Sequence, residues 1–216
     1  MRAVEPEIVV VDYGAGNLRS VAKALERLGA SPRVTSDPRA LLRARGVVLP
    51  GVGSSGTAMA ALEERRLVEP LRELMARGTP FFGVCLGMQL LFQTSEEDPR
   101  PCLGILPGRV RRLPGGLKVP HMGWNQVALL RPHPVFQDVP SGSEFYFVHS
   151  YYGEPADASL ALGTTDYGVT FCSAVARGNL VATQFHPEKS GPTGLRLYEN
   201  FLRLLVLEEA RPLPWR

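Results

Sequence analysis

Three apolar runs, each followed directly by a turn, organise the first half of the sequence. They are EIVVVD (7–12), GVVLP (46–50) and TPFFGV (79–84). Such runs are typical of strands buried on both faces of a parallel sheet. After the first run and its YGAGN turn, apolar residues such as Leu18 and Leu25 recur at helical spacing. A strand, a turn and a helix in this order form the repeating unit of a doubly wound α/β fold.

The rest of the sequence adds helices and then changes character. Helices are predicted over 57–77, over LGMQLLFQ (86–93) and over 193–207. Between about 101 and 185, proline and glycine are frequent and the apolar runs are short, which predicts mostly antiparallel strands. The prediction is a single domain over residues 1–216. Its fold class is α/β, with a mostly parallel open sheet flanked by helices and with added antiparallel strands.

Composition limits the classes of function. Of the 216 residues, 44% are apolar and 21% charged, and the positive residues behind the net charge of +3 are scattered. This predicts no nucleic-acid partner and no membrane partner. No apolar run reaches the roughly 18 residues of a membrane span, and MRAVEPE lacks the apolar stretch of a signal peptide. A cytoplasmic location is therefore expected, where Cys85, Cys102 and Cys172 remain thiols.

One of these cysteines lies in a turn suited to catalysis. The sequence FFGVCLGMQLL predicts a strand, a tight turn at Cys85 and then a helix. This is the thiol counterpart of the nucleophile elbow, and Gly83 and Gly87 supply the small neighbours that such a turn needs. The N-terminus of the helix would favour a thiolate at Cys85. A buried structural cysteine at an ordinary strand–helix turn is the alternative interpretation.

A nucleophilic thiol needs a base, and the base needs an orienting acceptor. Of the four histidines, only His186 follows a buried-strand pattern, LVATQF, and so lies at a strand end where α/β active sites form. Pro187 stops the strand, and the carboxylate of Glu188 can fix the tautomer of the imidazole. Alone, this pattern is also that of a structural histidine. Together with the cysteine turn, it favours a Cys–His–Glu triad.

A third segment, PGVGSSG (50–56), follows another predicted strand. Glycines on both sides of Val52 allow the backbone to approach a ligand and to change conformation. The backbone at Val52 and Gly53, with the N–H of Leu86, is predicted to form an oxyanion hole. An ordinary glycine-rich loop is the alternative. No metal-ligand cluster is apparent in the sequence, and no metal ion or organic cofactor is expected.

Together, PGVG, GVCLGMQLLF and QFHPEKS resemble the class I (triad) glutamine amidotransferases, over nearly the whole chain. DYGAGNLRSV, PHMGWN (120–125) and FYFVHSYY (145–152) are more specific, because they are similar to the glutaminase subunits of imidazole glycerol phosphate synthase. The resemblance implies a triad of Cys85, His186 and Glu188 that hydrolyses glutamine to glutamate and ammonia. It also implies a heterodimer with a (βα)₈-barrel cyclase subunit, which uses the ammonia in histidine biosynthesis.

The same resemblance implies roles for further residues. Those expected to bind glutamine are Gln89, Glu97, Ser150 and Tyr151. Within this set, Glu97 is expected at the end of the helix after the nucleophile and to bind the α-ammonium group. Those expected at the partner interface are Asn17, His121, Met122, Trp124, Asn125, Tyr146 and Lys189.

Three other functions fit parts of the pattern. A glutaminase serving a pyridoxal phosphate, purine or aminobenzoate synthase would share the triad but should lack PHMGWN. A stand-alone cysteine hydrolase or peptidase would be active without a partner. A non-enzymatic scaffold could hold a partner, although the intact Cys85, His186 and Glu188 argue against it.

Overall fold

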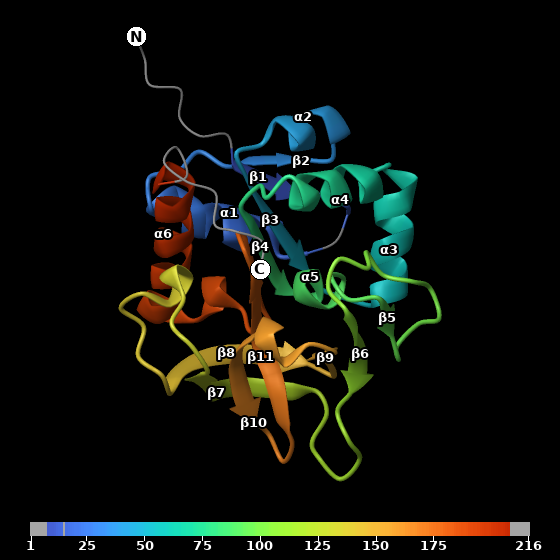
Figure 1. The fold of residues 1–216 in the computed structure, drawn as a ribbon, viewed down its shortest axis with the longest axis vertical. Coiled ribbons are helices and arrows are strands. Elements are labelled where there is room, and N and C mark those ends of the chain that lie inside the picture. Colours follow the sequence, from blue (N-terminus) through green and yellow to red (C-terminus); the bar gives the residue numbers. More distant parts are fainter. Residues whose placement is uncertain (1–7, 15, 208–216) are drawn as a thin grey trace.

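A twisted sheet runs through the centre of the molecule, and helices cover both of its faces (Figure 1). This computed structural model describes residues 8–14 and 16–207. One half of the sheet is parallel, in the strand order β2-β1-β3-β4-β12. Its elements are β1 (Ile8–Val11), α1 (Leu18–Arg27), β2 (Arg33–Thr35), α2 (Pro38–Arg43), β3 (Gly46–Gly51), α3 (Ser55–Glu64), α4 (Val68–Ala76), β4 (Phe81–Cys85), α5 (Leu86–Gln89), β12 (Leu180–Thr183) and α6 (Gly191–Leu207).

The order continues through antiparallel strands β11-β10-β7-β8, while β9, β6 and β5 branch from β11. The strands are β5 (Thr94–Ser95), β6 (Gly108–Arg112), β7 (His121–Leu129), β8 (Ser143–His149), β9 (Tyr151–Pro155), β10 (Ala161–Asp166) and β11 (Thr170–Arg177), and the 3-10 helices are η1 (Pro134–Phe136), η2 (Ala158–Leu160) and η3 (Pro187–Lys189). The α/β fold class predicted from the sequence is confirmed.

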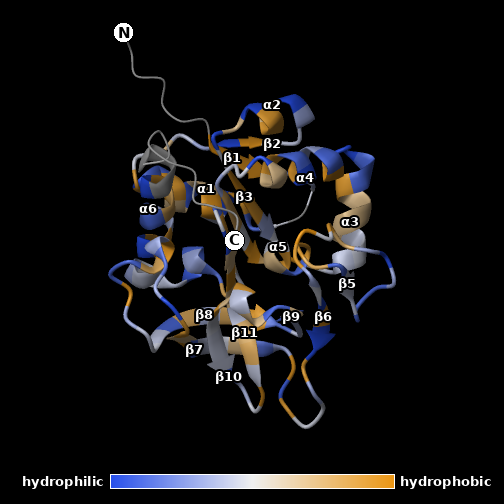
Figure 2. Cartoon of the chain, viewed as in Figure 1, coloured by the Kyte–Doolittle hydropathy of each residue, from blue (hydrophilic) through white to orange (hydrophobic). Residues whose placement is uncertain are grey.

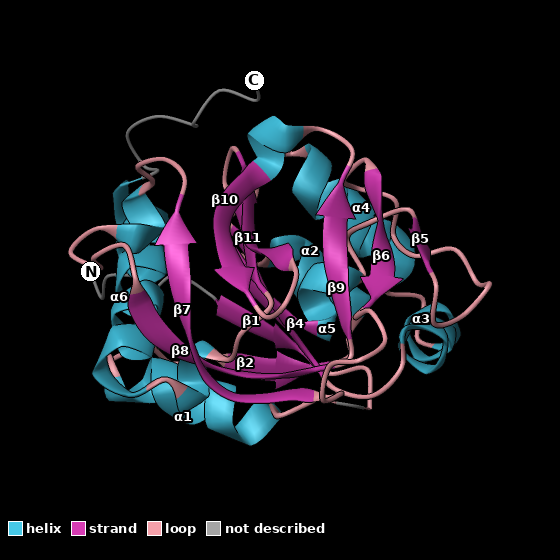
Figure 3. Cartoon of the chain, turned by 90° about the horizontal axis from the view of Figure 1, so that it is seen from below, coloured by secondary structure: helices cyan, strands magenta, loops and turns pink. Residues whose placement is uncertain are grey.

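Two hydrophobic cores lie on opposite faces of the parallel strands, because successive residues of a strand point in opposite directions. From β1, Val9 and Val11 pack into the core that α2, α3 and α4 cover, while Ile8 and Val10 pack into the core that α1 and α6 cover. Figure 2 shows the hydrophobic strands between helices with hydrophilic outer sides, and Figure 3 shows α1 and α6 opposite α3 and α4. Among the described residues, no helix is long and apolar enough to cross a membrane.

The structure corrects two predicted helices. The helix expected over 57–77 is two helices, α3 and α4, because Arg66 between them adopts a φ of 55°. The helix expected over 86–93 ends at Gln89. The N–H of Gln93, which would continue it, instead donates to the carbonyl of Gly108, and the carbonyls of residues 90–92 accept the N–H groups of residues 103–106. The dipole of so short a helix favours a thiolate less than the predicted helix would.

The parallel register brings three functional segments to one edge of the sheet. Gly51 at the end of β3 lies beside Cys85 at the end of β4. On the other side of β4, Thr183 at the end of β12 lies beside Val84. The PGVG loop, the cysteine turn and the HPE segment therefore meet at the carboxyl ends of neighbouring strands, where α/β folds bind ligands.

Candidate active site

Cys85 lies on a strained turn between β4 and α5. Its φ is 54° and its ψ is −108°, a conformation that residues other than glycine rarely adopt. Both flanking glycines are required by close packing. A Cβ on Gly83 would lie 2.9 Å from Cβ of Ala182, and one on Gly87 would collide with the carbonyl oxygen of Leu49. The turn therefore has the geometry of a nucleophile elbow.

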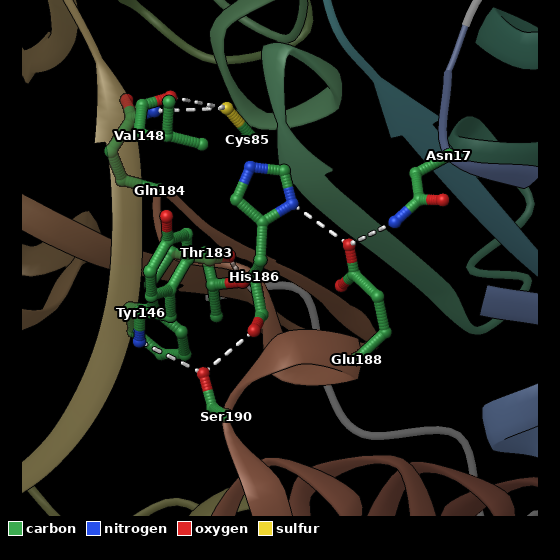
Figure 4. Close-up of polar contacts among 10 residues, drawn as sticks. Asn17, Cys85, Tyr146, Val148, Thr183, Gln184, His186, Glu188 and Ser190 are labelled. Atoms are coloured by element: carbon green, nitrogen blue, oxygen red, sulfur yellow. Dashed lines mark hydrogen bonds and ion pairs between the residues drawn. The ribbon is translucent and has the colours of Figure 1, made fainter. Parts of the chain in front are cut away.

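The sulfur of Cys85 is only slightly exposed, and polar groups surround it (Figure 4). Nε2 of Gln184 lies 3.5 Å from Sγ, and the carbonyl oxygen of Val148 lies 3.9 Å from it. Sequence reasoning did not identify Gln184. An amide side chain at the end of a buried strand, two residues before His186, was the signal that could have revealed it.

His186 and Glu188 form a buried pair beside this sulfur. Nδ1 of His186 lies 2.8 Å from Oε1 of Glu188, and the two side chains are 2% and 1% exposed. The other ring nitrogen, Nε2, is on the side of the ring nearer Cys85 (Figure 4) and has no hydrogen-bond partner among the described residues. Burial lowers the pKa of His186, but its interactions with the sulfur of Cys85 and the carboxylate of Glu188 outweigh burial and raise this pKa to about 9.

Strand β8 holds the histidine in place from the side. The backbone N–H of His186 donates to the carbonyl of Tyr146 at 2.9 Å. The hydroxyl of Ser190 donates to the carbonyl of His186 at 2.6 Å and accepts the N–H of Tyr146 at 3.0 Å. These three bonds tie the backbone of the HPEKS segment to a strand far away in the sequence and so fix the position from which the imidazole extends.

A cavity of about 290 Å³ opens over Cys85 and His186. All seven residues predicted for the oxyanion hole and for glutamine binding line it. The lining residues are Val52, Gly53, Cys85, Leu86, Gln89, Glu97, Pro120, Val148, His149, Ser150, Tyr151 and His186. Within the described residues, no group of three or more His, Cys, Asp or Glu side chains is placed to hold a metal ion.

The two glycines of the PGVG loop differ in their surroundings. A Cβ on Gly51 would lie 2.7 Å from Cβ of Leu86, so this residue is glycine because the strand end is crowded. Gly53 has a φ of 95° and open space around it. Of the two glycines, Gly53 is therefore the one that has free space around it and a backbone conformation suited to glycine.

Glu97 and Gln89 are both already engaged within the protein. Glu97 follows β5 in a loop, rather than ending a helix as expected, and its carboxylate accepts the N–H of Ser55 at 2.7 Å. Nε2 of Gln89 donates to the carbonyl of Tyr151 at 2.8 Å and to Oε1 of Gln184 at 3.0 Å. A ligand in the cavity would therefore meet the carboxylate of Glu97, which can exchange its present partner, and the amide oxygen of Gln89, since Nε2 of Gln89 is already bonded.

Most of the residues predicted at a partner interface gather around β7 and η3. Met122 and Trp124 on β7 are 61% and 55% exposed. The ring of Trp124 meets the ring of Tyr146 edge-on, and the ammonium of Lys189 lies 5.8 Å from the centre of that ring. These exposed apolar side chains form a surface suited to a partner.

The other predicted interface residues are different. Asn125 is partly exposed. The side chain of Asn17 turns to the triad, since its Nδ2 lies 3.4 Å from Oε1 of Glu188. His121 is only 3% exposed. Its ring points inward, so it offers a partner almost no surface, and the interface role predicted for this side chain is not supported.

A thiol, an imidazole and a carboxylate at the carboxyl ends of parallel strands are the arrangement of a triad-type α/β hydrolase. The class I glutamine amidotransferase model matches residues 9–205, and the chain belongs to that family. Similar proteins include the imidazole glycerol phosphate synthase subunit HisH of Dehalococcoides mccartyi, 53% identical over 92% of this chain and 98% of the relative. The HisH subunit of Moorella thermoacetica is also 53% identical, over 92% of this chain and 95% of the relative.

Solved structures show the same fold at lower identity. A crystal structure of a glutamine amidotransferase matches with a TM-score of 0.73 and 23% identity, over 92% of this chain and 98% of that one. The PurLQS structure from Thermotoga maritima matches with a TM-score of 0.74 and 20% identity, over 94% of this chain and 100% of that one.

The variant Glu188→Gln is expected to slow glutamine turnover less than the loss of His186 would. Glutamine keeps an acceptor oxygen for Nδ1 of His186 but loses the negative charge that supports the imidazolium. A hydrogen bond between charged groups contributes about 1.5–3 kcal/mol, so kcat/KM should fall about 10- to 100-fold. Steady-state kinetics measures this. The exposed Glu144 provides the control Glu144→Gln, and a loss beyond that of His186→Ala would contradict the supporting role of the carboxylate.

Proposed function

We propose that this chain is the glutaminase subunit of an imidazole glycerol phosphate synthase. It hydrolyses glutamine to glutamate and ammonia, and the ammonia passes to a cyclase subunit that uses it in histidine biosynthesis. The observation that carries this proposal is the position of Cys85, beside the buried His186–Glu188 pair, at the floor of a cavity. The HisH relatives, which match over nearly their full length, support the same assignment.

In the first step, the sulfur of Cys85 attacks the side-chain amide carbon of glutamine. The raised pKa of His186 keeps its imidazole protonated at neutral pH, which suits it to donate a proton to the departing ammonia. Glu188, bonded to Nδ1, supports the positive ring. The N–H of Leu86 and an N–H of the PGVG loop stabilise the negative oxygen of the tetrahedral intermediate.

In the second step, water attacks the resulting thioester, and His186, now neutral, accepts its proton. The carbon–sulfur bond breaks, glutamate leaves, and the free sulfur of Cys85 and the protonated His186 are restored for the next cycle. The proposed contacts of glutamine are its α-ammonium with Glu97 and its α-carboxylate with the Ser150–Tyr151 segment, both on the wall of the cavity. Glu97 would have to leave the N–H of Ser55, at least in part, to bind the ammonium.

The proposed partner is a (βα)₈-barrel cyclase that forms a heterodimer with this chain. Its docking surface would be the exposed side chains of Met122, Trp124 and Lys189 with the ring of Tyr146. This surface lies next to the triad, since the N–H of His186 bonds to Tyr146, so ammonia has a short path to the partner. We place the reaction in the cytoplasm, which suits three unpaired thiols.

The isolated chain is expected to hydrolyse glutamine poorly, and a ligand-loaded partner is expected to activate it. Rotation of the peptide between Val52 and Gly53 would decide whether an N–H or a carbonyl faces the oxyanion. Loss of one oxyanion donor costs about 10²–10³-fold in turnover. The test is a glutaminase assay of the chain alone, with the cyclase, and with the cyclase and its nucleotide ligand. Full activity of the isolated chain would instead favour a stand-alone hydrolase.

Lys189 is the proposed link between the partner and the triad. It is exposed, contacts the Tyr146 ring and adjoins Glu188 in the sequence. Lys189→Ala should reduce activation by the partner while changing its affinity little, because a protein interface of about 1,200–2,000 Å² does not depend on one lysine. The control is Arg43→Ala on α2, at the far end of the molecule from β7 (Figure 1). Equal losses of affinity and activation would contradict this role.

A further inference from the structure

We propose that Gln184 is a positioning residue for Cys85, and that a buried chain of hydrogen bonds starting at Asn125 on β7 holds it in place. This inference rests on the proposed function and adds residues to its site.

The first part of the chain fixes the amide of Gln184. This side chain is completely buried, with 0% of the residue exposed. Its Oε1 accepts Nε2 of Gln89 at 3.0 Å, which turns its own Nε2 toward Sγ of Cys85 at 3.5 Å. Reversing the amide would place two N–H groups of neighbouring glutamines against each other and a carbonyl oxygen against the sulfur. The amide therefore presents a donor to Cys85.

The second part joins Gln89 to a pair of buried histidines. Gln89 also donates to the carbonyl of Tyr151, at 2.8 Å, and the same oxygen lies 2.9 Å from Nδ1 of His149. Since a carbonyl only accepts, Nδ1 of His149 carries the proton. Nε2 of His149 lies 2.9 Å from Nδ1 of His121, and Nε2 of His121 lies 3.2 Å from Nδ2 of Asn125.

From Asn125 to the carbonyl of Tyr151, every donor points the same way as long as both rings are neutral, and that carbonyl also accepts the N–H of Gln89 from the other side. Burial lowers the pKa of His149 to about 3, with smaller contributions from the neighbouring His121 and His186 rings, and burial lowers the pKa of His121. Each neutral ring then donates through Nδ1 and accepts at Nε2. The ring of His121 is held between aromatic rings, with its centre 3.9 Å from that of Tyr167 and 4.9 Å from that of Phe147.

The chain links the surface proposed for the partner to the sulfur. Asn125 is partly exposed and follows Trp124 on β7, and its Nδ2 is also fixed by the carbonyl of Asp166 at 2.9 Å. From there, every polar link to Cys85 is buried or part-buried. An N–H at the sulfur stabilises the negative charge that makes it nucleophilic. Without it, the Cys85 side chain would lose both a donor and a constraint on its rotation.

The test measures how fast iodoacetamide alkylates Cys85 in the full chain, at one pH, without glutamine or partner, with peptide mass spectrometry to locate the label. Gln184→Leu is expected to slow alkylation about 10- to 100-fold, the effect of one hydrogen bond to a charged group. His121→Phe should slow it about three- to tenfold, because a neutral hydrogen bond contributes less. His121→Asn should stay within about twofold of the wild type, since its amide can donate from a position near Nδ1.

Tyr167→Phe is the matched control, because it keeps the ring on His121 and removes only a hydroxyl that bonds to the carbonyl of Lys118. Alkylation of the buried Cys102 or Cys172 reports loss of the fold. If Gln184→Leu shows such labelling, Gln184→Met is used in its place. In the active complex, Gln184→Met should lower kcat and leave KM nearly unchanged, because Gln184 does not line the cavity.

Two results would overturn the inference. One is an unchanged alkylation rate in folded Gln184 variants, which would show that the amide does not act on the sulfur. The other is an equal loss in His121→Phe and His121→Asn, which would show that ring packing matters rather than the hydrogen bond. Neither result depends on glutamine, so both are distinct from failure of the proposed function, which would appear as hydrolysis retained by Cys85→Ala.

Discussion

Replacing Cys85 by alanine is expected to abolish glutamine hydrolysis while the fold and partner binding are retained. Without the sulfur no thioester forms, and removal of the nucleophile from a catalytic triad lowers kcat by the order of 10⁶. Alanine removes only the thiol from a side chain that is 6% exposed and leaves the backbone turn in place. The complex should still form product from added ammonium salts, because the cyclase reaction does not require this thiol.

Cys102→Ala is the matched control for this variant. It removes an equally small, buried sulfur that lies outside the active-site cavity. Glutamine-dependent and ammonium-dependent product formation are measured for both variants with the cyclase present. Glutamine hydrolysis by Cys85→Ala at the wild-type rate would mean that another group is the nucleophile.

Removal of His186 is expected to have the next largest effect. General acid–base catalysis contributes about 10²–10⁴-fold, and Nε2 of His186 is the ring nitrogen on the side of the sulfur. His186→Ala would also leave the buried Glu188 without its partner. His186→Asn separates the two effects, because its amide can still donate to Glu188. His133→Asn is the control, since it keeps the acceptor for the N–H of Val135. Near-normal kcat/KM in His186→Asn would contradict the proton-transfer role.

The pH dependence follows from the same residue. The pKa of His186 is raised to about 9, so its proton is present at neutral pH and is lost as the pH rises through 9. Glutamine turnover that needs this proton should fall over the same range, and kcat/KM measured from pH 7 to 10 shows it. The residual activity of His186→Asn should lack this decline. A wild-type profile that stays flat up to pH 10 would argue against a protonated His186 as the acid.

The triad could be predicted from the sequence because each of its members lies at the end of a recognisable element. GVCLG predicts a tight turn after one buried strand, and HPE follows a second buried strand. In a parallel sheet, both ends lie at the same edge, so Cys85 and His186 were expected at that edge, and the pairing of β4 with β12 brings them together. The cavity-lining roles of Ser150 and Tyr151 came instead from the resemblance to a known family.

Other features depend on contacts that a single sequence does not reveal. The helix after Cys85 stops at Gln89, the N–H of Gln93 pairs with the carbonyl of Gly108 instead, and no local signal predicts that pairing. The resemblance to a known family implied an interface role for His121 and its neighbours in PHMGWN, yet strand alternation turns its ring inward. Gln184 reads as one polar residue in an apolar strand, and only the fold brings its amide to the sulfur.

The positive φ at Cys85 lowers the stability of the native state at the same position that activity requires to be cysteine. A non-glycine residue at such φ and ψ angles destabilises the native state by about 1–3 kcal/mol, and glycine would relieve most of that strain. Glycine would also remove the thiol. Selection of this protein for thermal resistance alone would therefore favour loss of its nucleophile, so any search for sturdier variants has to retain position 85 by an activity screen.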